Sequence, residues 1–138
     1  MDVLVDTSVW SLVLRRRPAL SGQQLDLANE LRRLFKEKRA CIIGAIRQEL
    51  LSGARTIDQL ARLREALREF ADVPVPSTYY ERAAELDFQL RSKGIKGKST
   101  DLLICATALE RDMAVFTTDK DFEHFKRGVP LRLHTIGS

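Results

Sequence analysis

Short apolar runs alternate along this chain with longer stretches in which apolar residues recur at helical spacing. The apolar runs predict strands at residues 3–5, 40–43, 71–75, 114–117 and 131–134. The longer stretches predict helices at residues 8–14, 23–38, 44–52, 57–70, 79–90, 102–111 and 122–125. Pro74 and Pro76 cut the third strand short, because proline cannot donate a hydrogen bond within a sheet.

Strands that alternate with helices are typical of a parallel sheet covered on both faces. We therefore expect an α/β fold, a three-layer α/β/α sandwich around a central, mainly parallel sheet of four or five strands. At 138 residues the chain is long enough to bury a core, and we expect a single domain over residues 1–138.

Composition limits the cellular context and the chemistry. No apolar run reaches the ~18 residues that would indicate a membrane span, and the N-terminus has no secretory pattern. Cys41 and Cys105 lie in apolar runs, as buried thiols of a cytoplasmic protein do, and the scattered cysteines and histidines have no zinc spacing. The net charge of +4 fits either a polyanionic partner or a solvated basic surface.

Carboxylates follow several of the predicted strands. Asp6 ends the first strand and Asp119 follows the strand at 114–117, so both lie at the carboxyl edge of a parallel sheet, where ligands bind. Asp101 lies in the first turn of an apolar helix with Ser99 or Thr100 as the expected N-cap. Glu49 follows the second strand.

Each acid has a structural alternative when it is considered alone. The helix dipole favours a carboxylate in the position of Asp101, and Glu49 could face solvent. Together the four would repel one another unless a cation neutralised them. Oxygen ligands suit a hard divalent ion such as Mg²⁺ or Mn²⁺, which can polarise a water molecule and stabilise charge on a phosphate. In a basic protein this pattern indicates a phosphodiester substrate.

These motifs resemble those of the PIN-domain ribonucleases, and among them the VapC-type toxins of toxin–antitoxin pairs. The resemblance runs nearly end to end. It rests on "LVDTSVW" with Asp6, "IRQELLSG" with Glu49, "STDLLICATAL" with Asp101, and "VFTTDKDF" with Asp119 and the further acid Asp121. Each motif is weak alone, but four in the family's order are specific.

The resemblance implies an endoribonuclease that depends on Mg²⁺ or Mn²⁺. It also implies a homodimer, inhibited by a small antitoxin that places a segment in or over the acidic site. Asp6 and Asp101 would hold the metal most directly, and Glu49 and Asp119 would complete the pocket. Hydroxyl groups that could orient carboxylates or water, or simply cap helices and turns, belong to Thr7, Ser8, Thr117 and Thr118.

Two basic clusters offer phosphate contacts. The loop before Asp101 carries Arg91, Lys93, Lys96 and Lys98, and these could contact RNA or be merely solvated. The same loop lacks the first glycine of a phosphate-loop motif, so we reject a nucleotide-binding function for it. The arginine run at 15–17 could bind RNA or the antitoxin, or end the first helix.

Trp10 is expected to pack in the core or a dimer interface, and His124 and His134 have no obvious acid–base partner. Two other functions stay open. One is a catalytically weak PIN-like module that binds RNA or protein. The other is a phosphotransfer or phosphatase α/β domain with Asp6 as the covalent nucleophile, which would usually require a lysine at a strand end. Lys120 is beside Asp119 but is expected to point outward.

Overall fold

A parallel sheet lies at the centre of the computed structural model, which describes residues 1–14 and 19–138. The sheet order is β2-β1-β3, with β1 at Val3–Val5, β2 at Ala40–Cys41 and β3 at Ala114–Phe116. Leu4 pairs with Cys41 on one side and with Val115 on the other. The side chains of β1 are fully buried, because helices cover both faces of the strand.

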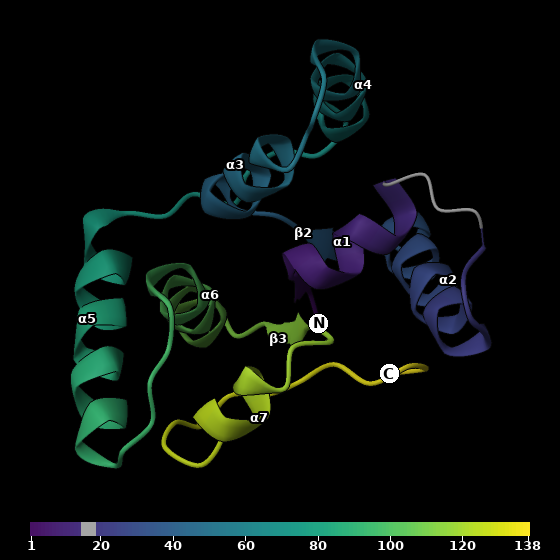
Figure 1. Ribbon diagram of the computed structural model, residues 1–138. Helices are drawn as coiled ribbons and strands as arrows, with labels where there is room; N and C mark the ends of the chain where they lie inside the picture. Colours follow the sequence, from purple (N-terminus) through teal and green to yellow (C-terminus); the bar gives the residue numbers. More distant parts are fainter. Residues whose placement is uncertain (15–18) are drawn as a thin grey trace.

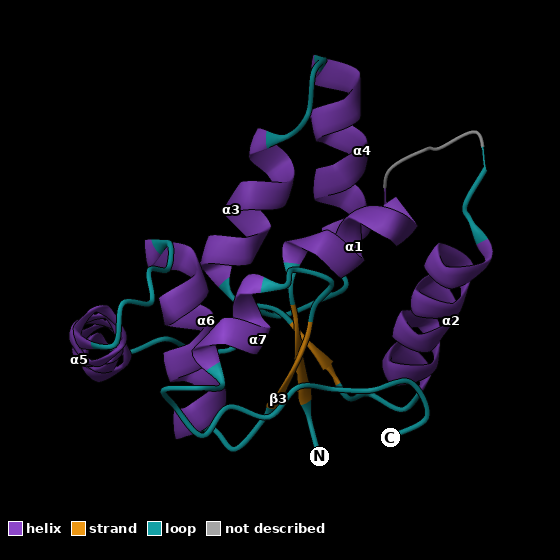
Figure 2. Ribbon diagram, turned by 60° about the horizontal axis from the view of Figure 1, so that its bottom comes forward, coloured by secondary structure: helices purple, strands orange, loops and turns teal. Residues whose placement is uncertain are grey.

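The helices match the predicted periodicity closely. They are α1 (Thr7–Leu14), α2 (Gly22–Lys36), α3 (Gly44–Ser52), α4 (Ile57–Leu67), α5 (Ser77–Ser92), α6 (Ser99–Glu110) and α7 (Asp121–Phe125). Figure 1 shows their order along the chain, and Figure 2 shows the sheet with α6 and α7 to one side and α2 to the other. The predicted α/β class is confirmed. The predicted role of residues 15–17 falls outside the described residues.

The predicted number of strands is wrong for the part of the chain that the structure describes, where the sheet has three strands. The segments at 71–75 and 131–134 each form a single parallel bridge, Ile42 with Asp72 and Val115 with Leu133. Pro74 and Pro76 remove donors from the first segment. The second turns away after His134, and the Ser138 amide donates to the Thr135 carbonyl at 3.1 Å.

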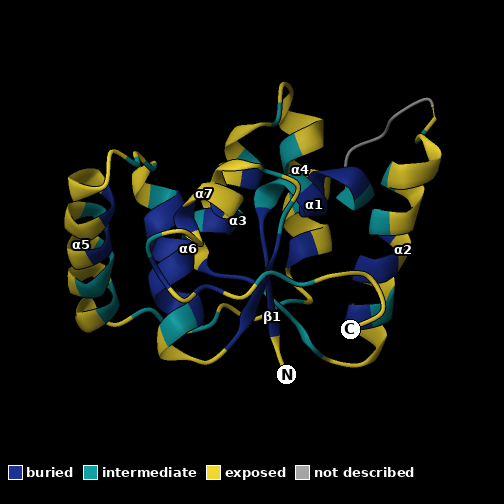
Figure 3. Ribbon diagram, turned by 90° about the horizontal axis from the view of Figure 1, so that it is seen from below, coloured by how far each residue is buried: buried dark blue, intermediate teal, exposed yellow. Residues whose placement is uncertain are grey.

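The core lies along the sheet and α6, where the dark blue ribbon of Figure 3 is concentrated. Trp10 is buried, as expected, with its indole N–H donating to the Val5 carbonyl at 2.9 Å and its ring 4.8 Å from that of Phe70. Cys105 is fully buried, whereas Cys41 is only half-buried. Among the described residues no helix is long and apolar enough to cross a membrane.

Helix α6 is buried over residues 101–108 because it is apolar on all sides and lies against both β3 and α5. The expected cap is wrong by one or two positions. Lys98 occupies the N-cap position without a side-chain hydrogen bond, and Ser99 is the first helical residue. Asp101 is therefore in the first turn, as predicted, and the helix dipole favours its charge.

His134 does have an acidic partner, contrary to expectation. Its Nε2 lies 2.5 Å from Glu30 Oε2, and the two side chains are 2% and 3% exposed. Arg33 donates to both Glu30 oxygens at 2.8 Å, and the Gly137 amide donates to Oε2 at 3.2 Å. This buried cluster ties the end of the chain to α2. The sequence could not show it, because 104 residues separate Glu30 from His134.

Candidate metal centre

Asp6 lies at the carboxyl end of β1, where the chain enters α1, and is 6% exposed. Its amide donates to the Phe116 carbonyl at 2.9 Å, which extends the pairing of β1 with β3 by one residue. Its Oδ2 accepts hydrogen bonds from the hydroxyls of Ser8 and Thr117, both at 2.8 Å. The parallel sheet thus brings together two motifs that lie 111 residues apart.

Ser8 and Thr117 each accept a backbone hydrogen bond as well as donating to Asp6. The Thr118 amide donates to Ser8 Oγ at 3.0 Å, and the Asp119 amide donates to Thr117 Oγ1 at 3.0 Å. These two hydroxyls therefore fix the Asp6 carboxylate relative to the loop that carries Asp119. Among the described residues, the Thr7 hydroxyl is buried without a partner, and Thr118 contributes its amide alone.

Asp101 faces this edge from the first turn of α6. The residue is 8% exposed, and its Oδ2 has no hydrogen-bond partner among the described residues. Burial, followed by the charges of Asp6 and Asp119, raises the pKa of Asp101 to about 6, while Lys98 opposes the shift. A buried carboxylate oxygen without a donor is unfavourable unless a cation binds it. The residues present therefore fit a metal ion.

The tightest acidic group in the described part of the chain consists of Asp101, Asp119 and Asp121. Each offers an oxygen within 4.8 Å of the others. The Asp121 amide donates to Asp119 Oδ1 at 2.9 Å, so the loop entering α7 holds two carboxylates side by side. Carboxylate oxygens at such spacing suit a hard divalent cation.

The acids that lie closest together in the structure differ from those that the sequence ranked first. Asp121, expected as a neighbour, belongs to the tight group, whereas Asp6 lies beside it and connects to Asp119 through Thr117. Glu49 is exposed on α3 and contributes only a small share of the charge that raises the pKa of Asp101. The Asp-x-Asp spacing after a strand is the sequence signal that could have ranked Asp121 higher.

The basic residues predicted for RNA lie on the approach to α6. Arg91, Lys93, Lys96 and Lys98 are all exposed. Arg91 forms an ion pair with Asp87 at 3.3 Å. Lys98 immediately precedes α6 and favours the ionised form of Asp101. Of the four, Lys98 is thus connected to the acidic group by a direct electrostatic effect.

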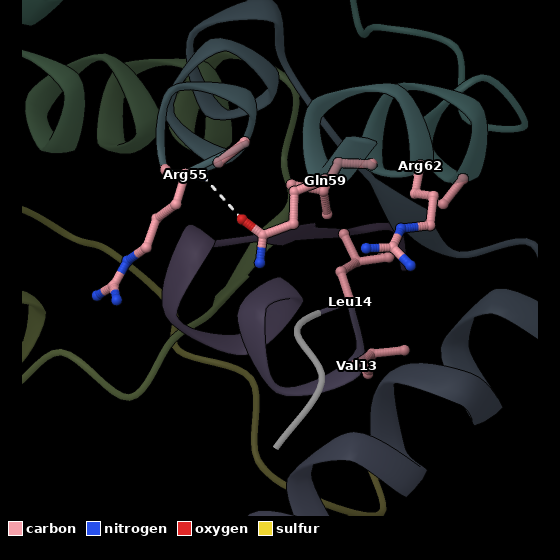
Figure 4. A pocket seen from close by; sticks show the side chains of 9 residues that line it. Val13, Leu14, Arg55, Gln59 and Arg62 are labelled. Carbon is pink, nitrogen blue, oxygen red and sulfur yellow. Dashed lines mark hydrogen bonds between the residues drawn. The ribbon is translucent and has the colours of Figure 1, made fainter. Parts of the chain in front are cut away.

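A separate hollow of about 540 Å³ lies where α1 meets α4 and the turn before it. Figure 4 shows its apolar wall, which includes Val13 and Leu14, together with the guanidinium groups of Arg55 and Arg62. The Arg55 amide donates to Gln59 Oε1 at 2.7 Å. The described residues that line this hollow include no carboxylate, so it is distinct from the acidic edge.

This protein is an α/β protein that has a parallel sheet with helices on both faces and carboxylates at one edge. The family model described as "PIN domain" matches residues 3–128, and the chain belongs to this family. Over 87 residues it is 31% identical to Ribonuclease VapC6 from Mycobacterium tuberculosis, which covers 61% of this chain and 68% of that protein. The expected resemblance to VapC-type PIN proteins is confirmed.

Solved structures show the same fold. The crystal structure of FitAcB from Neisseria gonorrhoeae has a TM-score of 0.75 and 21% identity over 96% of both chains. The crystal structure of VapBC2 from Rickettsia felis, bound to a DNA fragment from its promoter, has a TM-score of 0.72 and 21% identity over 97% of this chain and 98% of the other.

Proposed function

We propose that this PIN-domain chain is a metal-dependent endoribonuclease, the toxin of a type II toxin–antitoxin pair, which hydrolyses RNA phosphodiesters with a metal-activated water. The observation that carries the proposal is the buried Oδ2 of Asp101, which lies among other carboxylates and has no hydrogen-bond partner in residues 1–14 and 19–138. The likeness to Ribonuclease VapC6 supports RNA as the substrate.

The chain's own residues have distinct parts in this proposal. Asp101, Asp119 and Asp121 hold the cation most closely, with Asp6 beside them and Glu49 at the rim. Ser8 and Thr117 keep the Asp6 carboxylate in one orientation. When bound, Mg²⁺ or Mn²⁺ supplies a polarised water and offsets charge on the reacting phosphate.

We further propose a small cognate antitoxin as partner, a homodimer, a single domain over residues 1–138 and a cytoplasmic location. The solved relatives include VapBC complexes, which supports the partner. The hollow beside α1 combines apolar walls with Arg55 and Arg62. An antitoxin segment that mixes apolar and acidic residues fits this chemistry.

Cleavage of an RNA pool by the purified protein tests the enzyme assignment. We expect cleavage with Mn²⁺, none with EDTA, and none by Asp6→Asn or Asp101→Asn. Asp26→Asn is the matched control, since Asp26 is an exposed carboxylate on α2 and should leave cleavage unchanged. Cleavage by the Asp6 variant would indicate a contaminant. No cleavage by the wild type would favour the weak binding module instead.

The phosphotransfer alternative has less support. Asp6 Oδ2 already accepts two hydrogen bonds, and Lys120 is exposed. A phosphorylated Asp6 detected by mass spectrometry would revive that alternative.

A further inference from the structure

Exposed cations gather on two chain segments next to the acidic group, the loop at 93–98 and residues 120–127. They are Lys93, Lys96, Lys98, Lys120, Lys126 and Arg127. Across the described residues, none of the six lies within 4.0 Å of a carboxylate oxygen. Arginines elsewhere, such as Arg33, Arg39 and Arg47, are paired with acids. The six cations are therefore free to contact another anion.

Close packing brings the two segments side by side. A Cβ added to Gly97 would lie 2.9 Å from the Phe125 ring, so the loop at 93–98 packs directly against α7. A Cβ added to Gly128 would lie 2.6 Å from a methyl of Leu90 and 3.6 Å from Cδ of Lys93. The turn after α7 thus reaches the end of α5. Figure 1 shows that the loop at 93–98, which connects α5 to α6, lies between α5 and α7.

Both segments also have one end at the acidic group. The loop leads through Lys98 into the turn of α6 that carries Asp101, and α7 begins at Asp121. Phe122 and Phe125 point into the core from α7, whereas Lys120, Lys126 and Arg127, which flank this helix, are exposed. Glu123 is the one acid in residues 122–128, and it has no cation within 4.0 Å among the described residues. The two segments form a basic margin along one side of the site.

We propose that the turn at Lys126 and Arg127 continues the loop at 93–98 as one surface for the RNA backbone, on the α7 side of the metal centre. This inference rests on the proposed function and extends it by naming a second phosphate-contacting segment. Lysine and arginine contacts to phosphates position a nucleic acid but carry no sequence information. The turn therefore contributes affinity and salt dependence, while sequence preference arises elsewhere.

The double variant Lys126→Gln with Arg127→Gln tests the proposal. The matched control is Lys36→Gln with Arg64→Gln, which removes equal charge from exposed positions on α2 and α4. Fluorescence anisotropy with a labelled single-stranded RNA of mixed sequence, in an Asp101→Asn background, gives Kd across a KCl series. In the active background kcat, KM and the cleavage pattern are measured.

We expect Kd and KM to rise by about fivefold to tenfold in the double variant, with kcat within about twofold and cleavage positions unchanged. The slope of log Kd against log salt should fall by about 1.4, which is about 0.7 for each lost contact to a single strand. The control should match the wild type, and Lys126→Arg with Arg127→Lys should restore affinity.

Equal Kd and salt slope in the double variant and the control would overturn this inference, while cleavage by the wild type would leave the proposed function intact. The converse, a reduced slope without any cleavage by the wild type, would support the surface and reject the enzyme. A double variant that keeps RNA affinity but loses binding to an acidic peptide, with polyglutamate as the probe, would assign the surface to a protein and overturn the proposal.

Discussion

Two buried carboxylates in this protein have opposite surroundings. Glu30 receives hydrogen bonds from Arg33 and the Gly137 amide and contacts His134, and its pKa falls to about 2, chiefly because of Arg33. Asp101 has an oxygen that receives no hydrogen bond from the described part of the chain, and burial raises its pKa to about 6. The Glu30 carboxylate is satisfied by donors within the protein, whereas the Asp101 carboxylate would be satisfied by a bound cation. Burial alone does not distinguish the two; the donors around them do.

The largest effect is expected for Asp101→Asn. Activity should fall by at least about 100-fold, because the amide is a poor ligand for a hard cation. The free energy of unfolding without metal should stay the same or rise by about 1–2 kcal/mol, since the raised pKa means that the ionised form destabilises the fold above pH 6. Urea unfolding in EDTA measures this, and strong destabilisation would show that Asp101 mainly stabilises the first turn of α6.

Glu30→Gln should show the opposite pattern. Removing the charge leaves Arg33 and His134 with a weaker partner, and the free energy of unfolding should fall by about 3 kcal/mol. RNA cleavage under mild conditions should persist. Glu65→Gln, which breaks an exposed pair with Arg68, is the matched control and should cost less than about 0.5 kcal/mol. Equal losses in the two variants would contradict the structural role of Glu30.

The pH dependence of stability should differ in sign between the two carboxylates. The pKa of Glu30 is lowered from 4.5 to about 2, so its contribution is present above about pH 4.5 and disappears as the pH falls towards 2. The pKa of Asp101 is raised from 3.8 to about 6, so the metal-free protein gains stability as the pH falls from about 6 towards 4.

Urea unfolding of the wild type, Glu30→Gln and Asp101→Asn across pH checks both signs. The difference between wild type and Glu30→Gln should shrink towards pH 2, and that between wild type and Asp101→Asn should shrink towards pH 4. Differences that stay constant with pH would show that these shifts do not govern stability.

The smallest effect is expected at the hydroxyls that orient Asp6. Thr117→Val removes a 2.8 Å hydrogen bond to Asp6 Oδ2 and should weaken Mn²⁺ binding by about tenfold, as the loss of a group that supports a ligand usually does. Isothermal titration of Mn²⁺ measures this. Thr135→Val, at an exposed position in the C-terminal turn, should bind Mn²⁺ as the wild type does. Unchanged affinity in Thr117→Val would place Asp6 outside the metal's surroundings.

The helices and the parallel arrangement of the strands can be predicted from the sequence, as can the meeting of Asp6 with the segment that follows β3. Apolar periodicity fixes element type, and parallel strands place their carboxyl ends at one edge. The apolar character of residues 102–111 likewise predicted the buried helix that carries Asp101. These features depend on local pattern and on topology, which are both encoded along the chain.

Which acids come closest depends on tertiary packing and could not be predicted from the sequence. Asp121 lies close to Asp101 and Asp119 because its amide donates a hydrogen bond to the Asp119 side chain at the start of α7. Glu49, in contrast, lies exposed on α3. Tertiary packing also decided that His134 meets Glu30 across 104 residues of chain. The direction in which a side chain points depends on how each helix is rotated and packed against distant partners, and the local spacing of residues does not contain that information.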